Sequence, residues 1–376
     1  MKITVVCDVL GKENNGVTIA AMNLIRYLKE AGHEVTVLCA DADKLGKKGY
    51  FVVPNRDFKM FNAYLAKNGV SLAAPCREII EQAIDGADVI HIMLPFSLGQ
   101  ATAKIAEEKK IPMTAGFHLL AENFSTHIFM SKSKLVNHLT YEHFHNMYKR
   151  VDAIHYVSQY LRDVYEGMYG KTNGYVISNG VNEIFTPKEG EKKEDGFIDV
   201  LYTGRYSKEK SHKVLIEGVS KSRYKDKIRL TFAGGGPLKE KLEKEAEILP
   251  IKPRFGFYGR NEMVDLDRSA DLYVHAAEYE AEGIGCLEAI ACGTVPIINN
   301  APKSATRFYA IDERSLFDYN DADDLAKKID WWIEHPEKRR EYEKKYAAMA
   351  REKFDRGVCM KKMEQMLIET AAIKKR

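Results

Sequence analysis

Short apolar runs alternate with amphipathic helical patterns along most of this chain, and a polar, charged stretch at residues 187–196 interrupts the alternation once. Runs that are apolar at nearly every position predict strands buried on both faces, as in parallel sheets. The stretch at 187–196 has no apolar periodicity and indicates a linker. The chain is therefore predicted to fold as two doubly wound α/β domains in tandem. The expected strands cover residues 2–9, 34–40, 88–94, 111–118, 152–158 and 174–178 before the linker, and 197–204, 228–236, 253–259, 270–276 and 294–300 after it.

Composition narrows the class of protein further. A length of 376 residues fits two domains, and 45% hydrophobic with 30% charged residues is typical of a soluble protein. A net charge of +3 is too small to indicate nucleic-acid binding, and no apolar run reaches the roughly 20 residues of a membrane span. The first residues indicate a strand rather than a signal peptide. The six cysteines contain no C-x-x-C pair, which favours reduced thiols in a cytoplasmic protein.

The domain boundaries are expected near the linker. We expect an N-terminal Rossmann-like domain at residues 1–185, completed by a C-terminal helix at 353–376, and a second Rossmann-like domain at 186–352. In such sheets ligands bind at the carboxyl ends of the strands, in the loops that lead into helices. Two domains whose loop edges face each other would form a cleft. The chemistry is therefore expected in the strand-to-helix loops of both domains.

Three of these loops contain residues suited to phosphate binding. The loop at 10–17 lacks the G-x-G-x-x-G pattern, which disfavours a nicotinamide-dependent dehydrogenase, but Gly16 allows close backbone approach to a ligand. Arg205 and Lys210 flank a turn that enters a helix, where two cations beside free N–H groups would suit a diphosphate. Surface cations without a ligand remain the alternative for this loop. Gly235 lies in a three-glycine turn that either admits a ligand or serves backbone geometry alone.

The stretch at residues 278–296 places four glutamates around a Gly-x-Gly sequence. A helix is expected from Gly283 to a terminating Gly293, with free N–H groups at its start. Because helical side chains lean toward the N-terminus, Glu288 can reach a ligand there, and Glu280 can meet the same ligand from the preceding loop. Carboxylates repel phosphates, so their expected partners are the hydroxyl groups of a sugar and a ribose. The alternative is a solvated acidic loop whose glutamates interact with the helix dipole.

These motifs resemble those of a known family. The spacing Glu280-x7-Glu288, followed by LEAIACGTVPI, resembles the signature of retaining glycosyltransferases of family 4, which have the GT-B fold of two Rossmann-like domains facing a central cleft. The resemblance extends over nearly the whole chain. The segments DVIHIMLPFSLG at 88–99 and AGFHLLAEN at 115–123 are most similar to the branch that contains diacylglycerol glucosyltransferases. Further matching segments are NNGVTIAAMNLIRYLKEAGHEVTVL, YTGRYSKEKSHKVLIEG and VISNGVNEIFTP.

The resemblance implies an activity and a set of residue roles. It implies a hexosyltransferase that moves a hexose, expected from a UDP-sugar, to a hydroxyl group of a membrane glycolipid or diacylglycerol, with retention of configuration. No metal or other cofactor is implied. The N-terminal domain would bind the acceptor and the C-terminal domain the nucleotide sugar. The implied roles are diphosphate approach for Gly16, contact with the transferred sugar for His118, neutralisation of the leaving diphosphate for Arg205 and Lys210, sugar hydroxyl binding for Glu280, ribose binding for Glu288, and donor binding for Gly235, Gly283, Ile284 and Gly285.

Two features differ from the family pattern. Many relatives have Pro-Phe-Gly after the first glutamate, whereas this chain has Ala281-Glu282-Gly283, and the segment at 301–317 lacks the expected glycines. Both differences leave the donor sugar open. A soluble sugar, polysaccharide or cell-envelope glycan remains an alternative acceptor. A non-catalytic nucleotide-sugar-binding protein is a further alternative, which the intact set of site residues disfavours.

A segment after the expected strand at 111–118 combines aromatic residues with lysines. Phe124, Phe129, Lys132 and Lys134 would suit the surface of an anionic bilayer, which predicts a peripheral protein on the inner face of the cell membrane. Packing of this segment inside the N-terminal domain is the alternative. No metal site is predicted, because the spacing of the candidate ligands does not converge; these candidates are the Asp-x-Asp sequences at 41–43 and 265–267 and the group His138, Glu142, His143 and His145.

Overall fold

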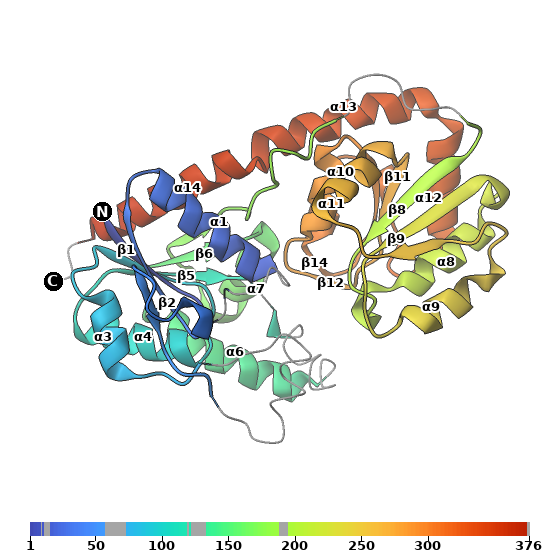
Figure 1. Ribbon diagram of the computed structural model, residues 1–376. Coiled ribbons are helices and arrows are strands. Elements are labelled where there is room, and N and C mark those ends of the chain that lie inside the picture. Colours follow the sequence, from blue (N-terminus) through green and yellow to red (C-terminus); the bar gives the residue numbers. More distant parts are fainter. Residues whose placement is uncertain are drawn as a thin grey trace. The chain divides into compact units, whose positions relative to one another are not determined.

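The computed structural model describes residues 1–8, 10, 16–56, 73–118, 120–121, 133–187 and 195–373. The chain divides into two compact units: unit 1 comprises residues 1–179 and 360–376, and unit 2 comprises residues 180–359. Each unit contains a parallel sheet flanked by helices (Figure 1). Among the residues described, no helix combines the length and the apolar character that crossing a membrane requires.

Unit 1 contains a seven-stranded sheet in the order β3-β2-β1-β4-β5-β6-β7. Every neighbouring pair of strands in it is parallel. Its central strands are buried at nearly every position, which explains why their sequences are apolar throughout instead of alternating. The strands are β1 (Lys2–Val6), β2 (Glu34–Cys39), β3 (Tyr50–Val52), β4 (Val89–Ile92), β5 (Met113–Phe117), β6 (Ala153–Tyr156) and β7 (Gly174–Val176), and the helices include α1 (Gly16–Glu30), α3 (Arg77–Ile84), α4 (Ser97–Glu108), α6 (Lys134–Tyr148) and α7 (Gln159–Tyr169).

The last helix of the chain, α14 (Arg356–Ala371), contributes its residues from 360 onward to unit 1. The Tyr27 hydroxyl donates to Glu364 at 2.8 Å, and Nε2 of His33 lies 2.8 Å from the same carboxylate. These contacts attach α14 to α1 and to the turn that follows α1. Figure 1 shows the red α14 running beside the blue α1.

Unit 2 contains a six-stranded sheet in the order β10-β9-β8-β11-β13-β15, and all neighbouring strands are again parallel. A separate two-stranded sheet joins β12 to β14. The strands are β8 (Ile198–Thr203), β9 (Ile228–Ala233), β10 (Arg254–Gly256), β11 (Leu272–His275), β12 (Tyr279–Glu280), β13 (Val295–Asn299), β14 (Lys303–Ser304) and β15 (Leu316–Phe317), and the helices are α8 (His212–Lys221), α9 (Lys239–Glu245), α10 (Arg260–Ser269), α11 (Ile284–Ala291), α12 (Ala322–Glu334) and α13 (Pro336–Lys353).

The strand order in unit 2 reverses once along the chain. The chain forms β8, β9 and β10 toward one edge of the sheet, then returns to the other side of β8 and forms β11, β13 and β15 toward the opposite edge. The connections that leave β8 and β11 therefore run in opposite directions, and sheets of this class bind ligands at that switch point. Unit 1 has the same reversal between β1 and β4. The predicted fold class, two doubly wound Rossmann-like domains, is confirmed.

The sequence patterns missed four short strands, namely β3, β12, β14 and β15. Each contains two or three residues, which is too few to produce a detectable period. Most of the predicted linker, residues 188–194, lies outside the described residues.

Candidate active site

The two strands at the switch point of unit 2 end side by side. β8 ends at Thr203 and β11 ends at His275, and the two strands pair directly with each other. The loop after β8 contains Arg205 and Lys210, and the loop after β11 leads into β12 with Glu280. The topology of the sheet thus places these three predicted residues at the carboxyl ends of two neighbouring strands of unit 2.

Lys210 and Glu280 form an ion pair in which the ammonium group donates to Oε2 of the carboxylate. The exposed fraction of the side chain is 19% for Lys210 and 18% for Glu280. Burial alone would raise the pKa of Glu280, but Lys210 and His275 lower it to about 2. Glu280 is therefore a carboxylate at neutral pH. Arg205 is exposed, and within the described part of the chain its guanidinium has no ion-pair partner.

The turn that presents Lys210 is held from two sides. Lys210 ends a short 3-10 helix, and Ser211 follows it in the left-handed conformation with a φ of 48°. This conformation is strained for a residue other than glycine, and the Ser211 hydroxyl donates to Glu278 at 3.0 Å. The Tyr202 hydroxyl donates to the Lys210 carbonyl at 2.7 Å. The sequence pattern assigned no role to Glu278, and the structure shows that it secures this turn.

Helix α11 follows β12 and ends where the sequence predicted. Gly293, with a φ of 85°, terminates the helix in the left-handed conformation. The first N–H groups of a helix have no carbonyl group one turn earlier to bind, and they are suited to an anion. The N–H group of Cys286 is already used, because it donates to the Gly283 carbonyl at 2.9 Å. The predicted donor-binding residues at the start of this helix are Gly283, Ile284 and Gly285.

Two glycines at the start of α11 are required by packing. A Cβ at Gly283, which has a φ of 81°, would lie 2.3 Å from Cγ2 of Thr306, and a Cβ at Gly285 would lie 2.2 Å from Oγ1 of Thr203. Neither distance is sterically possible, so any side chain would displace the helix from the sheet. Gly235 differs from both, because a Cβ there would meet no atom within 4 Å. Packing therefore does not require a glycine at 235.

Glu288 lies on the second turn of α11 and is partly buried. Burial raises the pKa of its carboxyl group to about 7, and Arg260 opposes this shift to a smaller extent. Asp267, on α10, is fully buried, and neither of its carboxylate oxygens has a hydrogen-bond partner in the described part of the chain. Burial, and then the charge of Glu288, raise the pKa of Asp267 well above its usual value. The sequence did not reveal this neighbour, because burial of a single acidic residue produces no pattern.

His118 lies in unit 1, directly after β5, and is 6% exposed. Its ring makes an edge-on contact with His155, with the ring centroids 5.3 Å apart. It also covers Gly116, where a Cβ would lie 2.2 Å from Nε2 of His118. Neither ring nitrogen of His118 has a hydrogen-bond partner among the residues described. Burial lowers the pKa of His118 well below its usual value, so the ring is neutral, with one nitrogen a donor and the other an acceptor.

The remaining predicted residues of unit 1 are only partly described. Gly16 is the exposed first residue of α1, and a Cβ there would meet no atom within 4 Å. Lys134 is the exposed first residue of α6. Phe124, Phe129 and Lys132 lie outside the described residues.

The histidine-rich pattern on α6 makes contacts with α7. His145 stacks on Tyr169 with the ring centroids 3.9 Å apart and lies 2.8 Å from the Tyr165 hydroxyl. The Tyr169 hydroxyl donates to Glu142 at 3.0 Å. Within the described ranges, no group of three or more His, Cys, Asp or Glu side chains is arranged to hold a metal ion.

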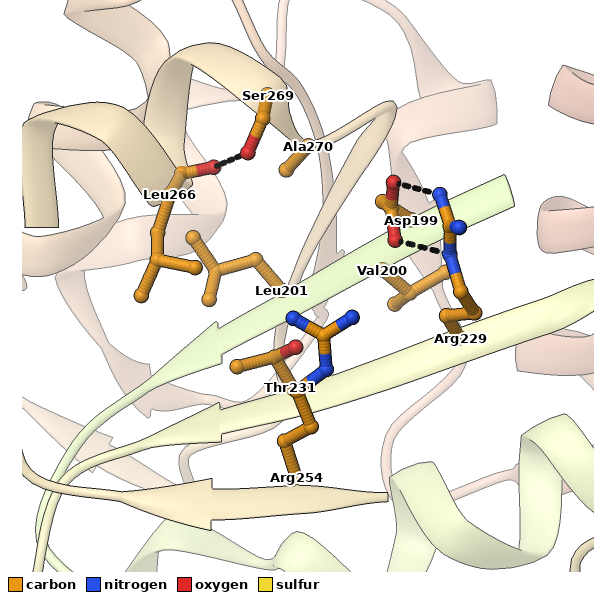
Figure 2. Close-up of a pocket in the computed structure, with 9 residues that line it drawn as sticks. All are labelled: Asp199, Val200, Leu201, Arg229, Thr231, Arg254, Leu266, Ser269 and Ala270. Carbon is orange, nitrogen blue, oxygen red and sulfur yellow. Dashed lines mark hydrogen bonds and ion pairs between the residues drawn. The ribbon is translucent and has the colours of Figure 1, made fainter. Parts of the chain in front are cut away.

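Figure 2 shows a pocket at the amino-terminal ends of the unit 2 strands, lined by residues that include those near the starts of β8, β9 and β10. Arg229 donates to both carboxylate oxygens of Asp199 there, at 2.8 and 2.5 Å (Figure 2). Because the strands are parallel, this amino-terminal edge is opposite the edge that carries Lys210 and Glu280. The ion pair joins β8 to β9 and takes no part in the candidate site.

Comparison with known proteins identifies the two parts of the chain. Residues 14–184 match the family described as Glycosyltransferase Family 4, and residues 183–349 match Glycosyl transferases group 1. Alpha-monoglucosyldiacylglycerol synthase of Streptococcus pneumoniae is 26% identical over 325 residues, which cover 80% of this chain and 72% of that protein. GDP-mannose-dependent alpha-mannosyltransferase of Corynebacterium glutamicum is 26% identical over 319 residues, which cover 79% of this chain and 72% of that protein.

A solved structure supports the fold. HepE of Anabaena, in complex with UDP, is similar with a TM-score of 0.76 at 17% identity, over 98% of this chain and 100% of that chain. The family matches and the parallel sheets of both units agree with the predicted family and fold. The chain belongs to the family 4 glycosyltransferases, has the GT-B fold, and is a hexosyltransferase.

Proposed function

We propose that this enzyme transfers a hexose from a nucleoside diphosphate sugar to a hydroxyl group of a lipid, such as diacylglycerol or a glycolipid, with retention of configuration. The observation that carries the donor half is the Lys210–Glu280 pair at the switch point of unit 2. It combines a cation suited to a diphosphate with a carboxylate suited to sugar hydroxyls. The start of α11 follows Glu280 by four residues and adds free N–H groups.

The chemistry explains why these groups belong together. Breaking the bond between the anomeric carbon and the phosphate oxygen leaves negative charge on the diphosphate. Arg205, Lys210 and the N–H groups of α11 stabilise this charge electrostatically. Retention follows when the acceptor hydroxyl attacks from the face that the diphosphate leaves and passes its proton to the departing phosphate oxygen. This route needs no protein nucleophile, and Glu280 acts by holding the sugar hydroxyls.

Glu288 is proposed to bind the ribose. Its position on the second turn of α11 directs the side chain toward the start of the helix. Because burial raises its pKa to about 7, the carboxyl group can either accept a hydrogen bond from a ribose hydroxyl or donate one to it near neutral pH. Arg260 is close enough to lower this pKa and adds positive charge on the same side.

The acceptor half rests on a relative and on the surface of α6. The S. pneumoniae relative is named for diacylglycerol. Helix α6 exposes Leu135 and Leu139, with exposed fractions of 68% and 58%, and Lys134 is exposed beside them. Apolar side chains four residues apart lie on one helix face, and together with a lysine they suit the surface of an anionic membrane. We propose that unit 1 binds the lipid acceptor.

The identity of the nucleotide is tested by thermal stabilisation. The sequence resemblance favours UDP, whereas the C. glutamicum relative is named for GDP-mannose, so both belong in a panel with ADP and NAD. A ligand present at 100 times its Kd stabilises the folded protein by about 2.7 kcal/mol, which raises the Tm of unit 2 by several degrees. We expect UDP to have the largest effect and NAD to have none.

A pair of variants assigns the effect to the candidate site. Lys210→Ala should abolish most of the nucleotide-dependent rise in Tm, because it removes the cation proposed to bind the diphosphate. Lys213→Ala is the matched control, since this lysine is 65% exposed on α8 and pairs with Glu217. The donor site is contradicted if no nucleoside diphosphate raises the Tm of the wild type, or if Lys210→Ala responds like Lys213→Ala.

A further inference from the structure

A chain of polar side chains runs beneath Glu280. Oγ1 of Thr203 lies 2.8 Å from the Tyr273 hydroxyl, which in turn lies 3.3 Å from Nδ1 of His275. Nε2 of His275 lies 3.5 Å from Oε2 of Glu280. Tyr273 is fully buried and His275 is 3% exposed. The sequence pattern points to none of Thr203, Tyr273 or His275, and the roles proposed above do not use them.

The hydrogen bonds in this chain have one consistent direction. Burial raises the pKa of Tyr273 well above its usual value, so its phenol stays protonated and can donate to Nδ1 of His275. Thr203 can then donate to the phenol oxygen. Burial also lowers the pKa of His275, which keeps the ring neutral with a single proton. Glu280 is a carboxylate and can only accept, which favours the tautomer with the proton on Nε2, the atom that faces it; Nδ1 then accepts from the Tyr273 hydroxyl.

The ring of His275 is fixed in orientation. It stacks against Tyr202 on one side, with the ring centroids 6.3 Å apart and the planes 14° apart. It also stacks against Tyr273, with the centroids 6.1 Å apart and the planes 23° apart. Gly285 leaves space for the hydroxyl chain, because a Cβ there would lie 2.2 Å from Oγ1 of Thr203 and 3.6 Å from the Tyr273 hydroxyl. A rotation that moved Nε2 away from Glu280 would have to break this packing.

Binding of the donor creates a need for such a group. When the ammonium group of Lys210 binds the diphosphate, it can no longer fully neutralise Glu280. A largely buried carboxylate that loses its cation is strongly destabilised unless another hydrogen-bond donor replaces it. We propose that His275 is a positioning residue that donates from Nε2 to Glu280 and holds it on the sugar hydroxyls when Lys210 turns to the diphosphate, with Tyr273 and Thr203 fixing the required tautomer. This proposal rests on the donor half of the proposed function.

The proposal is tested by comparing two ligands in one set of variants. A nucleoside diphosphate contacts Lys210 but carries no sugar, whereas the corresponding nucleotide sugar needs both Lys210 and Glu280. His275→Leu should therefore leave the Kd for UDP within about twofold of the wild type. It should lower kcat/KM for the UDP-sugar by about 10- to 100-fold, the range expected for a hydrogen bond to a charged group. His275→Gln, whose amide can donate to Glu280, should recover most of the activity.

Parallel losses of UDP affinity and activity in His275→Leu would contradict the proposal, and so would wild-type kcat/KM. Tyr273→Phe provides a milder change that removes one oxygen atom, and it should also lower kcat/KM without changing the Kd for UDP. Its control is Tyr346→Phe, because Tyr346 is equally buried and its hydroxyl accepts a hydrogen bond from the Ile311 N–H at 3.2 Å. Equal activity of Tyr273→Phe and Tyr346→Phe would overturn the tautomer argument.

A second readout does not depend on activity. Nitrogen-15 NMR of histidine-labelled protein distinguishes the two neutral tautomers, and the His275 signals are identified by their loss in His275→Gln. The wild type should carry the proton on Nε2, and Tyr273→Phe should show both tautomers. A proton on Nδ1 in the wild type would contradict the proposal. If the wild type itself neither binds UDP nor uses any nucleotide sugar, the proposed function fails, whereas an active wild type with unaffected His275 variants rejects this inference alone.

Discussion

Two glutamates separated by a single residue have different functions in this site. Glu278 binds the Ser211 hydroxyl, and it also accepts hydrogen bonds from Tyr319 and Asn320, both at 3.2 Å. It thereby joins three loops around Lys210. Glu280 is paired with Lys210 instead, and Nε2 of His275 lies 3.5 Å from its Oε2. The partners of each carboxylate therefore separate Glu278, which secures the turn at Lys210, from Glu280, the glutamate proposed to bind the donor sugar.

At the same scale, the close packing around Gly285 leads to a prediction about stability. Gly285→Ala should lower the free energy of unfolding by about 1–3 kcal/mol and weaken donor binding, because its Cβ would lie 2.2 Å from Oγ1 of Thr203. Alanine stabilises a helix interior by about 1 kcal/mol relative to glycine. A net loss in the free energy of unfolding therefore measures how far the cost of the clash exceeds that gain. Chemical denaturation followed by circular dichroism gives the free energy.

Gly235→Ala is the control for this substitution. A Cβ at Gly235 would meet no atom within 4 Å, so its stability should stay within about 0.5 kcal/mol of the wild type. An unchanged or increased stability of Gly285→Ala would show that α11 moves freely away from β8, contrary to the packing described here.

At the scale of helices and strands, the sequence predicted those parts of the site that have a local signal. The predicted helix after Glu280 and its terminating Gly293 are both present, because a Gly-x-Gly start and a glycine end are local signals. Lys210 could also be placed beside a helix start, because the turn that enters this helix is a local signal. His275 could not be found, since one histidine at the end of a strand has no characteristic spacing. Tyr273 shares a face of β11 with His275, but only the pairing of β11 with β8 brings Thr203 to Tyr273.

Three neighbouring strands of unit 1 contribute a row of buried histidines. His91 on β4 pairs in register with Thr114 on β5, and His155 on β6 pairs with Gly116 on β5. His118 fills the space above Gly116. Burial lowers the pKa of His91 to about 3 and that of His155 to about 4, so these rings stay neutral in the folded protein well below pH 6.5.

This row predicts that unit 1 loses stability in acid. Above pH 6.5 the histidines are neutral in both the folded and the unfolded chain and contribute no pH dependence. As the pH falls from 6.5 toward 4, only the unfolded chain binds these protons, so the free energy of unfolding decreases, by up to about 2 kcal/mol per histidine at pH 5. Hydrogen exchange of the β5 amides, corrected for its intrinsic pH dependence, measures the opening free energy at pH 7.5 and pH 5.

His155→Gln should reduce the difference between these two pH values, because the amide can still donate to the Ile177 carbonyl but cannot bind a proton. His138→Gln, at an exposed position of α6, should leave the difference unchanged. Equal opening free energies of the wild type at pH 7.5 and pH 5 would be inconsistent with a neutral histidine row.

At the scale of the whole molecule, the sequence predicted two doubly wound sheets because a polar stretch separates two series of apolar runs. The strand order, which sets the switch point of each unit, is not present in any local pattern, since it depends on which strands pair. From the sequence, a C-terminal helix at 353–376 is expected to complete the first domain, and the contacts of Glu364 with Tyr27 and His33 attach α14 to unit 1. The proposed division into a donor unit and an acceptor unit combines these facts with the family match.

The most direct test of the central claim is detection of the product by mass spectrometry. Wild-type enzyme is incubated with UDP-hexoses or GDP-mannose and with vesicles of phosphatidylglycerol that contain diacylglycerol, and a free sugar acceptor is supplied in parallel. We predict a hexosylated lipid from a UDP-hexose, and a rate at least about 100-fold lower for folded Glu280→Ala, whose carboxylate no longer holds the sugar. Absence of product with every donor, or a wild-type rate for Glu280→Ala, would contradict the account.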